Sequence, residues 1–385
     1  MRRIEIIIFA SAVVVSLLIG LSSLLPVEIY SSTAWQILWV VIAVALIFGI
    51  IMGRLWRNIP VFLMHVSFLC MIGGGFCTSR FSLNGILHLH PSQTARYFFT
   101  YDGELKKLPT SVTLLSFATE YYPDMDLPKD FKSELLTASG DTIHISMNHI
   151  GRLYDYRFYQ TSYDDQGGSV LTVTYDPVGI ALTYTGFLLF TLGGIAWLLK
   201  MTKRKLLIKK ILRAPKSKVV LAVGITIALL LLLAGMFGIK DLVTHPLLPV
   251  LASPWLAVHV SFLILAYAAL GFTLPVAITA LAVVRRRKRM ISLAFNLLAL
   301  GVFLLGLGII SGAMWANVSW GRYWAWDPKE TWALVTLLLY SIPLHRYFKM
   351  QNQPKFCAIY LILVFSSIIM TYLGVNYLPS LHAYN

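Results

Sequence analysis

The sequence predicts an all-α polytopic membrane protein with about nine transmembrane helices and one small β-rich extracytoplasmic domain. Hydrophobic residues make up 57% of the 385 positions and charged residues only 13%, which is typical of a chain with several membrane spans. Apolar runs of membrane-spanning length follow one another along most of the chain. One long segment instead alternates apolar and polar residues, which is the pattern of half-buried strands.

The predicted spans are apolar runs of roughly 17 to 25 residues, the length that crosses about 30 Å of hydrocarbon. They lie near residues 5 to 26, 34 to 53, 60 to 78, 178 to 199, 219 to 238, 255 to 284, 291 to 314, 332 to 349 and 356 to 375. The first lacks a small-residue cleavage site and is followed at once by a second long span. We therefore interpret it as a retained anchor.

The orientation follows from the basic loops, because short loops rich in Lys and Arg stay in the cytoplasm. The basic segments that fall on one side are "MRR", "GRLWRN", "KMTKRKLLIKKILRAPKSK", "RRRKR" and "HRYFKMQNQPK". This predicts a multi-pass membrane protein with a cytoplasmic N-terminus and an extracytoplasmic C-terminus. The net charge of +15 then reflects topology, and no nucleic-acid partner is expected.

The chain divides into two membrane halves. Residues 1–200 hold four spans and an outer insertion at about 79–177, whose stretches "SVTLLSFATEYY", "DTIHISMNHI", "YDYRFYQTSY" and "GSVLTVTYD" predict strands. "SYDDQGGSV" predicts a hairpin turn. Residues 201–218 form a basic cytoplasmic linker, and residues 219–385 hold five spans.

The cysteines exclude two kinds of chemistry. Cys70, Cys77 and Cys357 all lie in predicted spans, and Cys70 and Cys77 are too far apart along a helix for a disulfide. The chain contains no C-x-x-C and no C-x-x-C-H. It therefore has neither a thiol redox pair nor a covalent c-type haem site of its own.

Four histidines form two pairs by depth. His65 and His345 lie a few residues inside the cytoplasmic edge of their spans, whereas His259 and His382 lie at the outer edge. Two imidazoles at one level suit the axial positions of haem iron. For each histidine alone, hydrogen bonding to a neighbouring helix is the alternative. The outer-loop histidines are expected to be ordinary surface residues: His88, His90, His144, His149 and His245.

Tryptophan is concentrated between the seventh and eighth predicted spans. Five of the ten tryptophans lie in the loop 315–332, whereas an interfacial belt would distribute them over many span ends. Their flat faces can stack on a porphyrin. Asp327 has an alternative role, because "DPKE" is typical of a helix N-cap with Glu330 as the capping-box partner. Arg322 or Lys329 could pair with a haem propionate or simply lie at the interface.

The motif "WGRYWAWDPKETW" resembles the tryptophan-rich WWD signature of haem-handling membrane proteins. "SPWLAVHVSFLILAYAAL" and "GVNYLPSLHAYN" resemble the flanking histidine segments of the cytochrome c biogenesis A subunit. "HVSFLCMIGGGFCTSRF", the β-rich loop and "TVTYDPVGIALTYTGFLLFTLGGI" resemble the B subunit. Together these segments, which cover essentially the whole chain, are similar to the fused System II cytochrome c synthases.

This resemblance implies a role for each candidate residue. His65 and His345 would receive haem b from the cytoplasmic side, and His259 and His382 would hold its iron at the outer face. The reaction site is expected to comprise His259, His382, Trp320, Trp324, Trp326 and Asp327. Further contacts to haem are expected from Trp315, Gly321, Arg322, Tyr323 and Trp332.

The implied activity is that of a holocytochrome c synthase. It would add the two thiols of a C-x-x-C-H motif in apocytochrome c across the two vinyl groups of haem b. The implied partners are apocytochrome c, an extracytoplasmic thiol reductant of the thioredoxin type, and membrane lipid. The outer domain is shorter than in many family members. Contacts to apocytochrome that other members make through the missing parts are therefore not expected in this chain.

Two other functions fit part of the sequence. A haem transporter or exporter would share the tryptophan loop but deliver haem without making a bond. Transport of an unrelated solute would explain the membrane spans but not the two histidine pairs. Covalent attachment of haem to a cytochrome separates the first alternative from the synthase, and bound haem in the purified protein separates the second.

Overall fold

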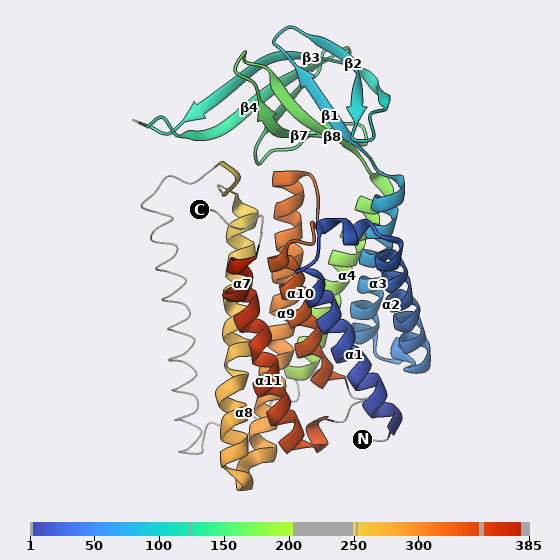
Figure 1. Ribbon diagram of the computed structural model, residues 1–385, viewed down its shortest axis with the longest axis vertical. Coiled ribbons are helices and arrows are strands. Elements are labelled where there is room, and N and C mark those ends of the chain that lie inside the picture. The colour runs from blue at the N-terminus through green and yellow to red at the C-terminus, as the bar shows by residue number, and fades with distance from the viewer. Residues whose placement is uncertain (1–2, 124, 203–248, 252, 346–349, 379–385) are drawn as a thin grey trace.

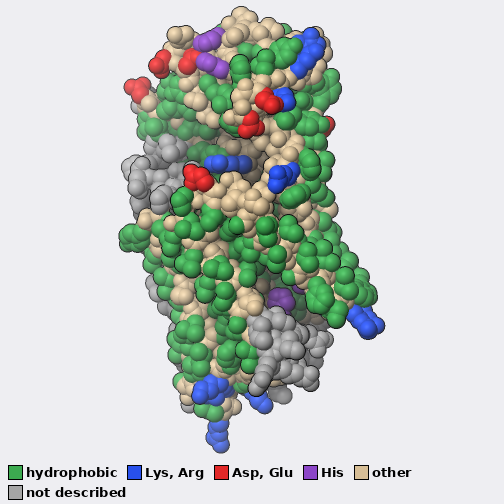
Figure 2. Space-filling view, turned by 45° about the vertical axis from the view of Figure 1, so that its right-hand side comes forward, with side chains coloured by type: hydrophobic (Ala, Val, Ile, Leu, Met, Phe, Trp, Pro, Cys, Tyr) green, Lys and Arg blue, Asp and Glu red, His purple; other side chains and the backbone are tan. Residues whose placement is uncertain are grey.

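The computed structural model describes residues 3–123, 125–202, 249–251, 253–345 and 350–378. Long helices run side by side through most of the molecule, and a curved antiparallel sheet lies across one end of them (Figure 1). We call this the sheet end. The opposite end carries basic side chains such as Arg287 and Lys355, and Figure 2 shows such side chains in blue at its tip.

The first half contributes α1 (Arg3–Ser22), α2 (Thr33–Met52), α3 (Ile59–Phe81) and α4 (Pro177–Thr202). Helices α3 and α4 pack closely because glycines face the partner helix. A Cβ on Gly74 would lie 2.4 Å from Thr183 Oγ1, and one on Gly186 would lie 2.8 Å from the carbonyl oxygen of Ser67. Small residues at such contacts let helix backbones approach each other within a membrane.

Between α3 and α4 the chain forms eight strands. They are β1 (Leu83–Leu89), β2 (Thr94–Thr100), β3 (Leu105–Tyr121), β4 (Pro128–Thr137), β5 (Thr142–Ser146), β6 (Gly151–Leu153), β7 (Tyr156–Tyr163) and β8 (Ser169–Tyr175). The order in the sheet is β5-β4-β3-β2-β1-β8-β7-β6, and every pairing is antiparallel. The strands that join the helices, β1 and β8, are therefore neighbours in the interior of the sheet.

The sheet curls around its own core. Strand β1 alternates buried Leu87 and Leu89 with outward-facing residues, as the twofold repeat of a strand requires. The buried Ser133 of β4 donates a 2.7 Å hydrogen bond to Gln160 of β7 and lies 2.7 Å from Ser169 Oγ. Strands far apart in the sheet order thus face each other across a core of leucine, valine and phenylalanine side chains.

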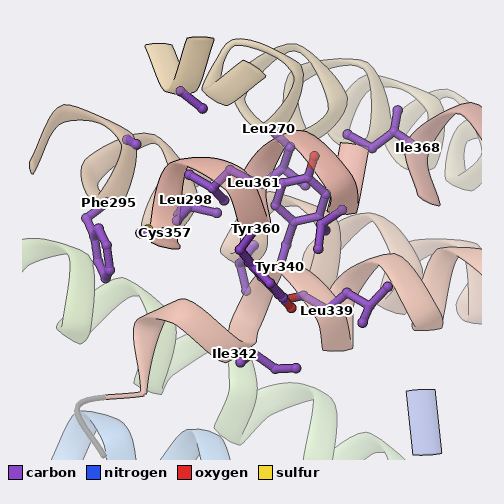
Figure 3. Packing of buried hydrophobic residues seen from close by; sticks show 14 of the residues in the cluster. Leu270, Phe295, Leu298, Leu339, Tyr340, Ile342, Cys357, Tyr360, Leu361 and Ile368 are labelled. Carbon is purple, nitrogen blue, oxygen red and sulfur yellow. The ribbon is translucent and has the colours of Figure 1, made fainter. Parts of the chain in front are cut away.

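The second half contributes α7 (Pro254–Gly271), α8 (Thr273–Ala282), α9 (Arg287–Trp320), α10 (Pro328–Ser341) and α11 (Pro354–Tyr372). Figure 3 shows how side chains from α7, α9, α10 and α11 interdigitate in one buried cluster, with Leu270, Leu298 and Leu361 near its middle. Within it, Tyr360 donates a 2.8 Å hydrogen bond to the carbonyl oxygen of Leu339.

The two halves pack against each other directly. The rings of Phe190 in α4 and Phe303 in α9 stack with centroids 5.9 Å apart, and a Cβ on Gly306 would lie 2.2 Å from Phe190. Ile19 and Trp35 of the first half belong to the same core cluster as the second-half helices. The described parts of both halves therefore share buried surfaces.

The structure corrects the predicted fold class. It has six helices long and apolar enough to cross a membrane, found among the described residues by length and composition, and its sheet of eight strands is large rather than small. The expected spans at 5 to 26 and 332 to 349 coincide with shorter apolar segments, Phe9–Ser22 and the 14-residue α10. The span at 219 to 238 and nearly all of the 201–218 linker lie outside the described residues.

Each error has a physical reason. The predicted span at 332 to 349 is cut short because helix α10 ends at Ser341 and a 3-10 turn, Ile342–Leu344, follows it and contains Pro343. Alternation identified the strands β3, β5, β7 and β8. Strand β6 has only three residues, β2 and β4 contain charged residues, and in β1 the outward-facing Ile86 masks the alternation of the buried Leu87 and Leu89. The predicted hairpin turn is confirmed, because Asp164 to Gly168 connect β7 to β8.

Candidate functional site

The structure brings His65 and His345 together. His65 lies in the first part of α3, and His345 directly follows the 3-10 turn after α10. Their ring centroids are 6.0 Å apart with an interplanar angle of 84°. Residues from the two halves of the chain, separated by most of its length, thus meet at one point toward the basic end of the bundle.

Each of these imidazoles uses Nδ1 to bind a backbone carbonyl one helical turn earlier. His65 Nδ1 lies 2.7 Å from the carbonyl oxygen of Val61, and His345 Nδ1 lies 3.0 Å from that of Ser341. A carbonyl oxygen can only accept, so Nδ1 carries the proton in both rings. The neutral tautomer with Nδ1–H places its lone pair on Nε2, the atom that a metal would bind.

His259 has the same arrangement near the sheet end. It lies in α7, and its Nδ1 donates to the carbonyl oxygen of Gly308 in α9 at 2.7 Å. Its ring is nearly parallel to that of Trp315, with centroids 6.5 Å apart and an angle of 17°. A Cβ on Gly312 would lie 2.6 Å from two ring atoms of His259, so this glycine makes room for the imidazole. His382, its predicted partner, lies outside the described residues.

The tryptophan loop, residues 315–332, begins within α9. Trp315 is buried and donates from Nε1 to the carbonyl oxygen of Val250 at 3.2 Å, and Trp320 lies against it with ring centroids 4.8 Å apart. The helix ends at Gly321, whose φ of +73° is the left-handed conformation typical of a helix C-terminus. Arg322, the next residue, is exposed.

Asp327 starts α10. Its Oδ2 accepts from the backbone N–H of Lys329 at 3.0 Å, and Glu330 Oε2 accepts from the backbone N–H groups of Ala325 and Asp327 at 2.9 and 3.3 Å. This reciprocal capping box confirms the local interpretation of "DPKE". Asp327 itself is buried, with 5% of its surface exposed.

Trp326 packs against aromatic residues that sequence reasoning missed. It stacks on Tyr30 with centroids 5.3 Å apart and an angle of 14°, and it also contacts Trp35 and Trp39, at 4.9 and 5.4 Å. Trp35 and Trp39 are four residues apart at the start of α2, on one helix face. The sequence did contain a signal for this contact: two tryptophans four residues apart near the outer end of a predicted span.

The remaining tryptophans of the loop have different surroundings. Trp324 packs edge-on against Trp326 at 5.7 Å, and its buried Nε1 has no hydrogen-bond partner among the described residues. Trp332 points elsewhere: its Nε1 donates to Ser23 Oγ at 3.1 Å, and a Cβ on Gly20 would touch its ring. Trp332 therefore joins α10 to α1.

The sheet lies directly on the loop through β7. Tyr159 donates to Asn317 Oδ1 at 3.4 Å, and its ring lies beside Gly321. Arg157 donates from Nη1 to the hydroxyl of Tyr323 at 3.5 Å. Burial raises the pKa of Tyr323 and of Tyr159, so both phenols stay protonated. Arg157 and Tyr159 are a second set of loop neighbours that no sequence motif indicated.

Two family models match the chain. The cytochrome C assembly protein family matches residues 180–382, more than half of the 385 residues, and the ResB-like family matches residues 53–176. The first match contains α9, the tryptophan loop and α10, and the second contains α3 and the whole sheet.

Named relatives agree with these matches. The cytochrome c biogenesis protein CcsA of Synechococcus sp. is 32% identical over 229 residues, covering 49% of this chain and 74% of the relative. CcsA of Chlamydomonas reinhardtii is 38% identical over 151 residues, covering 36% and 43%. Protein NrfI of Wolinella succinogenes is 37% identical over 173 residues, covering 40% and 19%. The chain thus spans less than half the length of the last two relatives.

The six candidate spans and the two adjacent family matches lead to one assignment. His65, His259, His345 and the tryptophans of the loop 315–332 fall within the matched regions, whereas Trp35 and Trp39 precede them. The chain is a multi-pass membrane protein that belongs to the cytochrome c assembly family and joins to it a ResB-like first half.

Proposed function

We propose that this protein takes haem b from the cytoplasmic side of a bacterial inner membrane to the outer face. There it attaches haem through thioether bonds to the C-x-x-C-H motif of apocytochrome c. In this orientation the sheet end and the C-terminus are extracytoplasmic and the N-terminus is cytoplasmic. The observation that carries the proposal is that His65, His345 and His259 each bind a carbonyl through Nδ1, which directs the lone pair of Nε2 away from that bond.

The inner pair fits an iron held between two imidazoles. The 6.0 Å between the ring centroids of His65 and His345 is on the order of the separation that two axial ligands would have, because a metal–imidazole nitrogen bond is about 2 Å long. Both residues lie toward the end of the bundle that carries Arg287 and Lys355. The pair would therefore receive haem on the cytoplasmic side.

The outer site would combine His259 with the tryptophan loop. The imidazole of His259 lies beside Trp315, and the buried indole N–H of Trp324 is a donor for a haem substituent. Arg157, above the loop, and Arg322, within it, are cations suited to haem propionates. His382 is proposed as the second axial ligand.

The reaction itself needs no protein nucleophile. Each substrate thiol adds across one vinyl group, so that sulfur bonds to one carbon and the thiol hydrogen ends on the other. No oxidant is consumed, and the thiols must arrive reduced, which assigns a thioredoxin-type reductant as a partner. The protein would supply position: it holds the haem with its vinyl groups facing the docked peptide, and orientation of this kind contributes several kcal/mol to a bimolecular step.

The deciding experiment expresses this chain with an apocytochrome in a host stripped of its own maturation system. The expected result is a cytochrome that keeps haem in a denaturing gel. Apocytochrome without covalent haem, together with haem in the purified membrane protein, would instead indicate a haem exporter. A protein purified without haem from haem-replete cells would contradict both.

The ligands are tested separately from the activity. The His65→Ala and His345→Ala variants should lose the low-spin b-type absorption of the inner site, and His259→Ala should lose attachment while added imidazole partly restores it. The His149→Ala variant is the matched control, because His149 also binds a backbone carbonyl through Nδ1 but lies in the sheet domain. An unchanged reduced spectrum in all three ligand variants would contradict the proposed sites.

A further inference from the structure

Two outer-domain histidines and one aspartate meet on the surface of the sheet. His88 lies in β1, His90 directly follows it, and Asp164 begins the turn between β7 and β8. His88 and His90 are two residues apart along the chain, so they share one face, opposite to the buried side chains of β1. Figure 2 shows histidine side chains in purple beside acidic ones in red at the sheet end.

Asp164 is fixed so that one oxygen faces both histidines. Its Oδ1 accepts from the backbone N–H groups of Gln166 and Gly168 at 2.9 and 2.7 Å. Its Oδ2 lies 2.6 Å from His88 Nε2 and 3.6 Å from His90 Nε2. The backbone N–H groups lower the pKa of Asp164, so the carboxylate is ionised. The turn thus orients the carboxylate independently of the histidines.

Gly168 makes this approach possible. A Cβ at that position would lie 2.4 Å from Asp164 Oδ2 and 2.9 Å from His90 Nδ1. Any larger residue would therefore push the carboxylate and the second imidazole apart. The absence of a side chain at 168 is a second feature of the sequence that keeps the three groups together.

The donor atoms have the spacing of a metal site. All three lie within 4.8 Å of one another, and the donors of a tetrahedral zinc ion with bonds of about 2.0 to 2.1 Å are roughly 3.3 Å apart. The His90–Asp164 distance is already close to this value, and the shorter His88–Asp164 distance is that of a hydrogen bond which a metal would replace. The side chains of His88, His90 and Asp164 are 46%, 41% and 27% exposed, which leaves room for water as a further ligand.

We infer that His88, His90 and Asp164 form a binding site for a divalent transition metal ion, with Zn²⁺ as the ion that suits this donor set. Two imidazole nitrogens and one carboxylate oxygen favour a borderline cation over Mg²⁺ or Ca²⁺, which prefer oxygen ligands alone. The site is independent of the haem ligands. Its ion would tie β1 to the β7–β8 hairpin, and β7 is the strand whose Arg157 and Tyr159 rest on the tryptophan loop.

The chain offers a matched comparison. His144 Nδ1 lies 3.2 Å from Glu134 Oε1 on neighbouring strands, and both side chains are exposed. This pair has the same chemistry, but among the described residues no third donor joins it. Among the described residues, His88, His90 and Asp164 are the group in which three such donors converge.

The test measures Zn²⁺ binding to the detergent-purified full-length protein after removal of any affinity tag. Wild type, His90→Gln and the control His144→Gln are titrated with Zn²⁺ against a chromophoric chelator. We expect wild type and His144→Gln to bind one Zn²⁺ with the same affinity. His90→Gln should bind it at least about tenfold more weakly, since even loss of an outer-sphere partner typically costs 10- to 100-fold in metal affinity. Equal binding by all three proteins would overturn the inference.

A spectroscopic measurement checks the ligands directly. X-ray absorption at the zinc edge of the loaded wild-type protein should show two imidazole ligands, and His88→Gln should remove one of them. Excess Mg²⁺ should not displace the zinc. A zinc shell without imidazole, or one that is unchanged in His88→Gln, would assign the ion to another part of the protein and contradict the site.

Discussion

At the residue scale, the same hydrogen bond recurs at three histidines. His65 and His345 bind a carbonyl in their own chain segment, whereas His259 reaches across to α9. Metal-binding histidines generally donate their second nitrogen in this way, which fixes both the tautomer and the ring orientation. The carbonyl bound by His259 was not predictable from sequence, because it depends on how α7 lies against α9.

Gly312→Ala should weaken the outer site although no ligand residue is replaced. The added methyl would lie 2.6 Å from His259, and relieving such an overlap typically costs about 1–3 kcal/mol. We expect lower haem attachment while the spectrum of the inner pair persists. The control is Gly301→Ala on the same helix, whose Cβ would meet Leu270 at the same 2.6 Å. Equal loss of attachment in both variants would show a general packing defect.

Two roles of Asp327 can be separated by substitution: capping of the α10 N-terminus and a contribution of its negative charge to haem attachment. Asn caps helices about as well as Asp, so Asp327→Asn should keep the thermal stability, while Asp327→Ala should lose about 1 kcal/mol. If Asp327 only caps α10, haem attachment should follow the same order. Loss of attachment in the stable Asn variant would require a role for the negative charge. Thermal unfolding and haem staining together distinguish the two.

At the element scale, the N-terminal part of α2 completes the surroundings of the tryptophan loop. Local patterns predicted the loop, its cap and the positions of most long helices, because each depends on residues close in sequence. The contact of Trp326 with Tyr30 and Trp35 joins segments nearly 300 residues apart. The strands β1, β2, β4 and β6 were missed for a related reason: their identity depends on their partners in the sheet.

Trp35→Ala should impair haem attachment although residue 35 lies outside the tryptophan loop, residues 315–332. Trp35 is buried and packs edge-on against Trp326, and removing a buried tryptophan typically costs about 3–5 kcal/mol. The control is Trp56→Ala, because Trp56 is 47% exposed in the 3-10 turn Leu55–Arg57. Comparable attachment by the Trp35 and Trp56 variants would mean that the loop holds its shape without α2.

At the scale of the whole molecule, the two halves contribute to both candidate sites. The inner pair takes one histidine from each half, and the tryptophan loop contacts α2 from below and β7 from above. The sequence predicted that His65 and His345 lie together, and the structure brings them together. The pairing of His259 with His382 stays a prediction, because His382 lies outside the described residues. The sequence could not predict the large sheet resting on the loop, since the contacts of Arg157 and Tyr159 arise only from tertiary packing.

Residues 1–202 and 203–385 made as separate polypeptides should co-purify. The stacked Phe190 and Phe303 and the contact of Trp332 with Ser23 join described parts of the two halves without the intervening segment. Gly306→Leu should reduce the association, because even a Cβ there would lie 2.2 Å from Phe190. Gly73→Leu, which meets nothing within 4 Å, is the control. Halves that purify independently would contradict this interface.

The pairing of β1 with β8 has an evolutionary consequence. The chain enters the sheet from α3 and leaves it into α4 through two adjacent strands, with Leu83 opposite Tyr175, and Thr78 donates to Asp176 at 2.6 Å beside this junction. Entry and exit therefore share one narrow stem. Material can be added at the distant hairpins, or the whole insert exchanged, without changing the spacing of the two helices. Such a stem allows the sheet to change in length and sequence during evolution while the helices that carry it keep their positions.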